Sequence, residues 1–279
     1  MRIELVGRRP LLRRLCFVEP EAGSLVLDAR QLTFASPLDL AAMVALARAA
    51  GARGEHVQLI TPRDRNVASY LERLDVISGL PPGADVVGDL PGGPRADLAD
   101  RLLEVTPLRP DGANQLSERM GRMLTRHYGD LGRRYFSGVG ELIDNAISHG
   151  VSSLGAFVAA QVYTGATSGR PGIEFAVCDT GVGVRAHLGH TLADDVLVDD
   201  VAALEAALRP GVTGTREKRG HGLNDLWRAV PKGGFARLQL RSGKGLASVV
   251  GDGGSRRPAC VPSDVEVAGT WAFLRVHPY

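Results

Sequence analysis

Cysteine is scarce in this sequence, and the few cysteines present lie far apart. The 279 residues contain three of them, Cys16, Cys178 and Cys260, and no CxxC pair. An odd number of widely spaced cysteines supports neither a disulfide framework nor a zinc knuckle. Aromatic residues make up only 5% of the chain, which argues against binding of single-stranded nucleic acid by base stacking.

Long apolar runs and an excess of one charge are also missing. The longest apolar run, residues 40–47, is far shorter than the roughly 20 residues that span a bilayer. The basic N-terminus has no uninterrupted apolar stretch of signal-peptide length. A net charge of +2 gives no strong attraction to nucleic acid or to a membrane. We therefore expect a cytoplasmic protein that binds neither of them.

The composition that is present, with 44% hydrophobic and 23% charged residues, is that of a globular protein with a core. Strand and helix signals alternate in the first part of the chain, which predicts a small α/β domain over residues 1–80. Its expected elements are strands at 25–29 and 56–60 and helices at 37–50 and 64–76. Residues 81–100 contain four prolines and several glycines, which indicates a linker.

The second domain is expected over residues 101–279. A strand and two helical segments come first, and mostly sequential strands follow. This order predicts an α+β sandwich with one mixed sheet and helices on one face. In the sequence FARLQLRSGKGLASVVG we expect a hairpin with Gly243 and Gly245 at its turn.

The segment ELIDNAISHG carries an acid and an amide on one face of a predicted helix. Glu141 and Asn145 are four residues apart, so their side chains point the same way. Apolar side chains such as Leu142 and Ile143 occupy the other side, where they can bury against a sheet. An amide oxygen suits magnesium, and a nearby glutamate can polarise a hydroxyl or a water molecule. Alone, the pair is more typical of a solvated polar helix face than of a metal–nucleotide site.

Two further segments combine glycines with chemically active groups. In VCDTGVGV, an apolar strand delivers Asp179, and Gly181 and Gly183 let the backbone approach a ligand closely. A carboxylate there can accept the exocyclic amine of adenine, although a plain strand-end turn has the same composition. In RGHGLNDL, Gly220 and Gly222 flank His221 before a predicted helix that Leu223 opens, a position that favours bound phosphate.

A fourth segment, GTWAFLRV, places Thr270 at the start of the last strand. In this order the four segments resemble the N, G1, G2 and Gly-Thr boxes of the GHKL superfamily, the Bergerat-fold ATPases of gyrase, heat-shock chaperones, histidine kinases and mismatch-repair proteins. The long glycine-rich stretch between the second and third segments resembles the ATP lid. The resemblance covers roughly residues 102–279.

The resemblance implies that ATP and Mg²⁺ are the cofactors. Asn145 would bind magnesium, Asp179 would bind the adenine amine, and Thr270 would support that contact. Glu141 matches the catalytic base of those members that have an acid there. The cofactor-binding residues expected from the boxes are Asp179, Gly181, Gly183, Gly220, His221, Gly222, Leu223 and Thr270.

ELIDNAISHG looks most similar to the anti-sigma-factor serine kinases among histidine-kinase-like ATPase domains. Residues 25–50 resemble the STAS domain of anti-sigma-factor antagonists, the usual partners of these kinases. Where that family places its phosphoacceptor serine, this sequence has Leu38, just after Ser36 and Pro37. The resemblance therefore implies an N-terminal regulatory module and phosphoryl transfer to a serine or threonine of a STAS-type partner. A second copy of the chain is a further candidate partner.

Two other functions remain open from the sequence. A non-catalytic protein that switches its interactions when ATP closes the lid would need the same boxes. Gly181, Gly183 and Ala186 also fit a dinucleotide fingerprint with Asp199 and Asp200 further on, which would indicate an NAD-binding oxidoreductase. That interpretation leaves the Glu141 helix unexplained.

Overall fold

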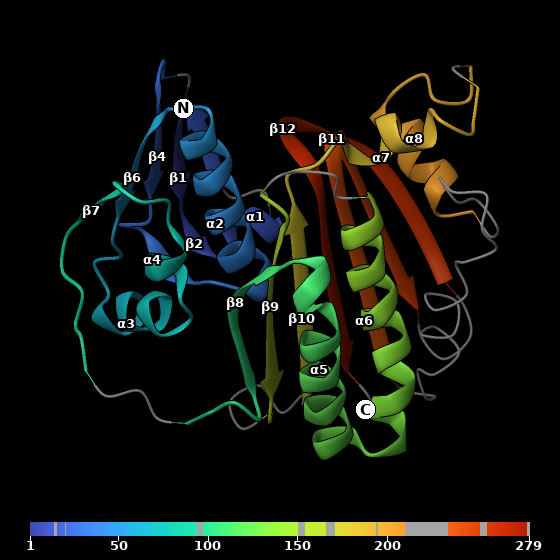
Figure 1. Ribbon diagram of the computed structural model, residues 1–279, viewed down its shortest axis with the longest axis horizontal. Helices are drawn as coiled ribbons and strands as arrows, with labels where there is room; N and C mark the ends of the chain where they lie inside the picture. Colours follow the sequence, from blue (N-terminus) through green and yellow to red (C-terminus); the bar gives the residue numbers. More distant parts are fainter. Residues whose placement is uncertain are drawn as a thin grey trace.

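The computed structural model describes residues 1–13, 16–19, 21–93, 97–149, 154–165, 171–193, 195–209, 234–251 and 256–277. It contains two five-stranded sheets, with one long helix between them and two helices on the far face of the second sheet (Figure 1). None of the described helices combines the length and apolar content needed to cross a bilayer.

The first sheet belongs to what we call the N-terminal unit, residues 1–93. Its strand order is β3-β1-β4-β6-β7, and only β3 runs antiparallel to its neighbour. The strands are β1 (Arg2–Leu5), β3 (Cys16–Glu19), β4 (Ser24–Asp28), β6 (His56–Ile60) and β7 (Asp85–Val87). A short parallel pair, β2 (Gly7–Arg8) and β5 (Leu32–Phe34), lies beside it.

The helices of this unit follow the sequence patterns with one interruption. They are α1 (Pro10–Arg13), α2 (Pro37–Ala52), α3 (Arg65–Arg73) and α4 (Val76–Gly79). The single helix expected over 64–76 is divided because Asp75 adopts a left-handed conformation, with φ of 59°. β7 lies inside the predicted linker, so the first sheet continues beyond residue 80, as far as Val87.

The C-terminal unit, residues 97–277, is built on the second sheet. Its strand order is β11-β12-β10-β9-β8, and every pairing among the described strands is antiparallel. The strands are β8 (Leu102–Leu108), β9 (Ala156–Tyr163), β10 (Gly172–Asp179), β11 (Phe235–Gly251) and β12 (Arg256–His277). Helices α5 (Ala113–Tyr128) and α6 (Asp130–His149) cover one face, and α7 (Gly183–Leu188) and α8 (Asp200–Ala207) lie at one end.

The prediction of a mixed sheet is therefore wrong for the described strands of the C-terminal unit. Eight residues separate β9 from β10 and four separate β11 from β12, whereas a parallel pair needs a crossover of a dozen residues or more.

The prediction of a hairpin with its turn at Gly243 and Gly245 is also wrong. These glycines form a bulge inside β11, where α8 packs against the strand. The bulge bends the strand locally, and the chain does not reverse direction there.

The two predicted helices of the C-terminal unit, α5 and α6, lie on one face of its sheet, but the sequence did not predict that a helix of the N-terminal unit covers the other. α2 covers the face of the second sheet that α5 and α6 leave open. Side chains of β9 and β10 alternate between the two faces. Phe157, Ala159, Ala176 and Cys178 join the core around α2, while Val158, Ala160, Phe175 and Val177 join the core around α5 and α6.

α2 is buried on nearly all sides, in keeping with a composition that is apolar apart from Asp39 and Arg48. Ser36 caps its N-terminus, and Ser36 and Asp39 form a reciprocal capping box with Pro37 in the first turn. Because α2 packs on both sheets, the two units share one hydrophobic core.

Candidate functional site

Asp179 ends β10, the central strand of the second sheet, and its side chain is only 5% exposed. Its Oδ1 accepts hydrogen bonds from the main-chain N–H groups of Gly181, at 2.9 Å, and Thr270, at 3.1 Å. Burial raises the pKa of Asp179 to about 6, and these two N–H donors limit the rise. The carboxylate therefore fixes both the turn after β10 and the start of the final strand segment.

Thr270 was expected to support the contact of Asp179 with a base, and the structure places these two residues together. The contact between them is made by the main-chain N–H of Thr270. This geometry needs no particular side chain at position 270, so the Thr270 side chain, which is half-buried, stays a separate prediction.

The segment that we call the Asp179 loop, residues 179–184, is held by a serine that the sequence patterns did not indicate. Ser242 Oγ accepts the N–H of Val184 at 2.9 Å and donates to the carbonyl of Gly269, also at 2.9 Å. Gly183 and Gly269 both have positive φ, at 80° and 71°. A Cβ on Gly183 would lie 2.8 Å from Ser242 Oγ, and one on Gly269 would lie 2.5 Å from Asp179 Oδ1. Only glycine allows this close packing.

A cavity of about 740 Å³ opens beside this loop. Its walls include Gly181, Gly183, Ser242 and Gly269, together with Asp200 of α8. The volume falls in the range of small-molecule sites. Of the predicted binding residues that the structure describes, Gly181 and Gly183 line this cavity, whereas Asp179 and Thr270 lie next to lining residues and are not part of its wall.

Glu141 and Asn145 lie on α6 as the spacing predicted. Both side chains are half-buried, the neighbouring Asp144 is exposed, and Leu142 and Ile143 are buried against the sheet. Neither Glu141 nor Asn145 is among the described residues that line the 740 Å³ cavity. The C-terminal end of α6 nevertheless lies at the same end of the second sheet as the end of β10 (Figure 1).

Part of the predicted site cannot be placed. Gly220, His221, Gly222 and Leu223, which the resemblance assigns to the lid and the phosphates, lie outside the described residues. The basic residues Arg216, Lys218 and Arg219 lie there as well. The described part of the site therefore consists of the Asp179 loop, its β11 and β12 supports, and α6.

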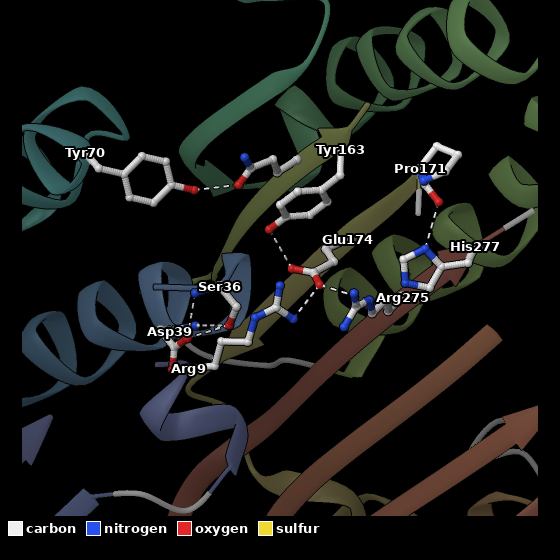
Figure 2. Close-up of polar contacts among 10 residues, drawn as sticks. Arg9, Ser36, Asp39, Tyr70, Tyr163, Pro171, Glu174, Arg275 and His277 are labelled. Carbon is white, nitrogen blue, oxygen red and sulfur yellow. Dashed lines mark hydrogen bonds and ion pairs between the residues drawn. The ribbon is translucent and has the colours of Figure 1, made fainter. Parts of the chain in front are cut away.

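A second buried polar group joins the two units, and Figure 2 shows it. Glu174 of β10 is fully buried and accepts hydrogen bonds from Arg9, at 2.5 Å, and from the Tyr163 hydroxyl, at 2.8 Å. Arg275 of β12 lies 3.3 Å from the same carboxylate. Burial, reinforced by the negative charge of Glu174, raises the pKa of Tyr163, so this hydroxyl stays protonated.

This group is an internal ion network because its carboxylate has no exposed surface. Nearby, the Tyr70 hydroxyl of α3 donates to Gln161 of β9 at 2.6 Å (Figure 2). The sequence signal for the network was a glutamate within the otherwise apolar strand GIEFAVCD.

The dinucleotide-binding interpretation is inconsistent with the sheet. That fold places its glycine turn between parallel strands joined by a helix, whereas β10 is antiparallel to both β9 and β12. The two acids that it invoked also have other roles. Asp199 caps α8 through the N–H of Ala202, and Asp200 accepts the N–H of Lys244.

Comparison with known proteins gives little further support. No protein-family model matches the chain, and no curated protein matches it. One solved structure with similarity is the B subunit of DNA gyrase from Myxococcus xanthus, at 17% identity and a TM-score of 0.19. The match covers 38% of this chain and 27% of the gyrase subunit. Gyrase is a namesake of the superfamily that the four boxes resemble, but a similarity this weak does not establish a common fold.

Proposed function

We propose that this protein binds ATP with magnesium at the end of the second sheet, between the Asp179 loop and α6. The observation that carries the proposal is the buried Asp179 carboxylate, which holds, through two main-chain amides, the loop whose glycines, Gly181 and Gly183, line the cavity. A buried acid with a raised pKa at a cavity is a frequent mark of a ligand site. The order of the four sequence boxes supports ATP as the ligand.

The described residues fit the purine end of such a ligand. An ionised carboxylate accepts about four hydrogen bonds, and the two amides use only Oδ1 of Asp179. The carboxylate therefore retains acceptor capacity for an exocyclic amine. The close glycine packing at Gly183 and Gly269 keeps side chains out of the space beside it.

The metal and phosphate end rests on α6. Asn145 would offer its amide oxygen to magnesium, which prefers oxygen ligands and keeps several waters or phosphate oxygens. When bound, magnesium would supply charge neutralisation at the phosphates. Glu141, one turn earlier on the same half-buried face, would orient or deprotonate an acceptor hydroxyl.

We further propose that the reaction is phosphoryl transfer to a serine or threonine of a protein partner of the STAS type, in a regulatory pathway of the anti-sigma-factor kind. The alternating strands and helices of the N-terminal unit support a STAS-like assignment. Ser36, the serine nearest to the expected phosphoacceptor position, is fully buried as the cap of α2. The unit would thus be a regulatory module and not the substrate.

Turnover separates a kinase or ATPase from a switch that only binds ATP. The test is phosphate release, and transfer of labelled phosphate to a partner, by the wild type and Glu141→Ala. Asp144→Ala is the matched control, because this acid lies on the exposed side of the same helix turn. Turnover lost in Glu141→Ala alone, with ATP binding retained, supports catalysis. Binding without turnover in the wild type supports the switch.

A further inference from the structure

The Asp179 loop is connected to the N-terminal unit through two consecutive residues of β11. Ser242, described above, holds the loop through Val184 and Gly269 and is 3% exposed. Arg241 precedes it and is also 3% exposed. Neighbouring residues of a regular strand face opposite sides, and both are buried here because each side of β11 is covered just before the bulge at Gly243.

Arg241 reaches out of its own sheet to the N-terminal unit. Its Nη1 donates to the main-chain carbonyl of Leu11 in α1 at 2.9 Å, and its Nη2 donates to Ser263 Oγ of β12 at 3.2 Å. Its guanidinium carbon lies 5.8 Å from the ring centre of Trp271. The side chain is thus fixed at three points, in a position where a charged group is costly to bury.

The contact continues into the longest helix of the N-terminal unit. The N–H of Leu11 donates to Asp39 Oδ1 at 2.7 Å, and Asp39 belongs to the capping box of α2. Buried hydrogen bonds therefore run from the start of α2 through Leu11 to Arg241, and the peptide bond joins Arg241 to Ser242, which holds the Asp179 loop.

We propose that Arg241 is a positioning residue, through which the N-terminal unit holds the Asp179 loop in its binding conformation. The structural part of this inference stands without a ligand; its consequence for nucleotide affinity rests on the proposed function. A hydrogen bond from a charged donor is roughly twice as strong as a neutral one. Removing that donor leaves the buried carbonyl of Leu11 unsatisfied, so α1 and the loop should loosen together.

The test is amide hydrogen exchange, followed by mass spectrometry on the full chain without nucleotide. Arg241→Met keeps the length and apolar stem of the side chain but removes the donors. Arg237→Met is the matched control, because Arg237 is an exposed arginine of the same strand that lies over Phe235. In Arg241→Met we expect exchange to be about tenfold faster in α1 and in the Asp179 loop. Exchange in α5 and α6 should stay as in the wild type.

Equal exchange in wild type and Arg241→Met overturns the proposal, as does a uniform rise over the whole second sheet, which would mean general destabilisation. If Arg241→Met does not fold, Arg241→Lys keeps the charge with a single donor group. If exchange in Arg241→Lys is faster only in α1 and the Asp179 loop, the proposal is supported. If the exchange rates of these two segments equal those of the wild type, the proposal is overturned.

Nucleotide titration of the same variants adds a separate readout. If the wild type binds ATP, Arg241→Met should bind it about tenfold more weakly, and Arg237→Met should match the wild type. Failure of the wild type to bind ATP would contradict the proposed function and leave the exchange result to decide the role of Arg241. Unchanged ATP affinity in Arg241→Met would contradict the positioning role alone.

Discussion

Two aspartates show how differently the chain uses a buried carboxylate at a strand end. Asp28 ends β4 and Asp179 ends β10, and each is 5% exposed. Hydrogen bonds from Arg30 above all, aided by Arg2, hold the pKa of Asp28 down at about 2. Asp179 receives only main-chain donors among the contacts that the structure describes, and burial raises its pKa to about 6. Asp28 thus contributes to stability through its arginine partners, and the proposed function gives Asp179 the role of ligand binding.

Asp179→Asn should therefore separate stability from binding. The folded-state pKa of Asp179 is above its ordinary value of 3.8. The stability that this carboxyl group contributes to the fold is therefore complete below about pH 4 and is lost as pH rises through 6. A shift of about two units corresponds to about 3 kcal/mol. Chemical denaturation between pH 4 and 8 should show that Asp179→Asn removes this decline. ATP affinity at pH 7.5 should fall about 10- to 100-fold.

Asp28→Asn is the matched control, with the opposite expectation. Its pKa is lowered in the fold, so its stabilisation is present above about pH 4 and is lost as pH falls toward 2. The substitution should lower the free energy of unfolding by about 1–3 kcal/mol at neutral pH and leave ATP affinity unchanged. Equal effects of the two substitutions on ATP affinity would contradict the roles assigned here.

At the scale of elements, the loop after β10 depends on a close approach of two backbones. Gly269→Ala would place its Cβ 2.5 Å from Asp179 Oδ1, at a φ of 71°. Gly23 has the same φ with nothing within 4 Å, so Gly23→Ala introduces the backbone strain without the clash. Thermal unfolding should show a loss of about 1 kcal/mol for Gly23→Ala and a larger loss for Gly269→Ala. Only Gly269→Ala should weaken ATP binding; equal behaviour of the two would contradict the packing described for the loop.

Elements with a strong local pattern were predicted well from the sequence. The strand at 56–60 and the helix that became α2 were recognised because a short apolar run and an Ala/Leu-rich segment with helical spacing are patterns of neighbouring residues. The long strands β11 and β12 were missed because glycines at 243 and 245 signal a turn as readily as a bulge. Ser242 and Arg241 were missed because their partners are far away in the sequence.

At the scale of the whole molecule, α2 joins the two sheets through one shared hydrophobic core. The face of β9 and β10 that carries Phe157, Ala176 and Cys178 is covered by α2 of the N-terminal unit. The nearly continuous apolar run at residues 172–179 is typical of a strand buried on both faces, but the sequence could not show that α2 covers the second face, because α2 is far away in the chain.

Removing residues 1–100 should consequently expose an apolar sheet face and leave Glu174 without Arg9. We expect residues 101–279 alone to be insoluble or partly folded, and the full chain to unfold in a single transition by calorimetry. Within the full chain, Leu40→Ala in α2, a fully buried position, should lower the free energy of unfolding by about 2–5 kcal/mol and shift both units together. Two separate transitions, with only the first moved by Leu40→Ala, would contradict the shared core.

The central claim is that Asp179 and Asn145 belong to one ATP–magnesium site, and calorimetric titration of the full chain tests it most directly. ATP would be titrated with and without magnesium into the wild type, Asn145→Ala and Asp179→Asn. The wild type should bind ATP more tightly with magnesium, Asn145→Ala should lose the magnesium dependence, and Asp179→Asn should lose its preference for ATP over GTP. Absence of ATP binding by the wild type, or unchanged affinity in both variants, would contradict the assignment.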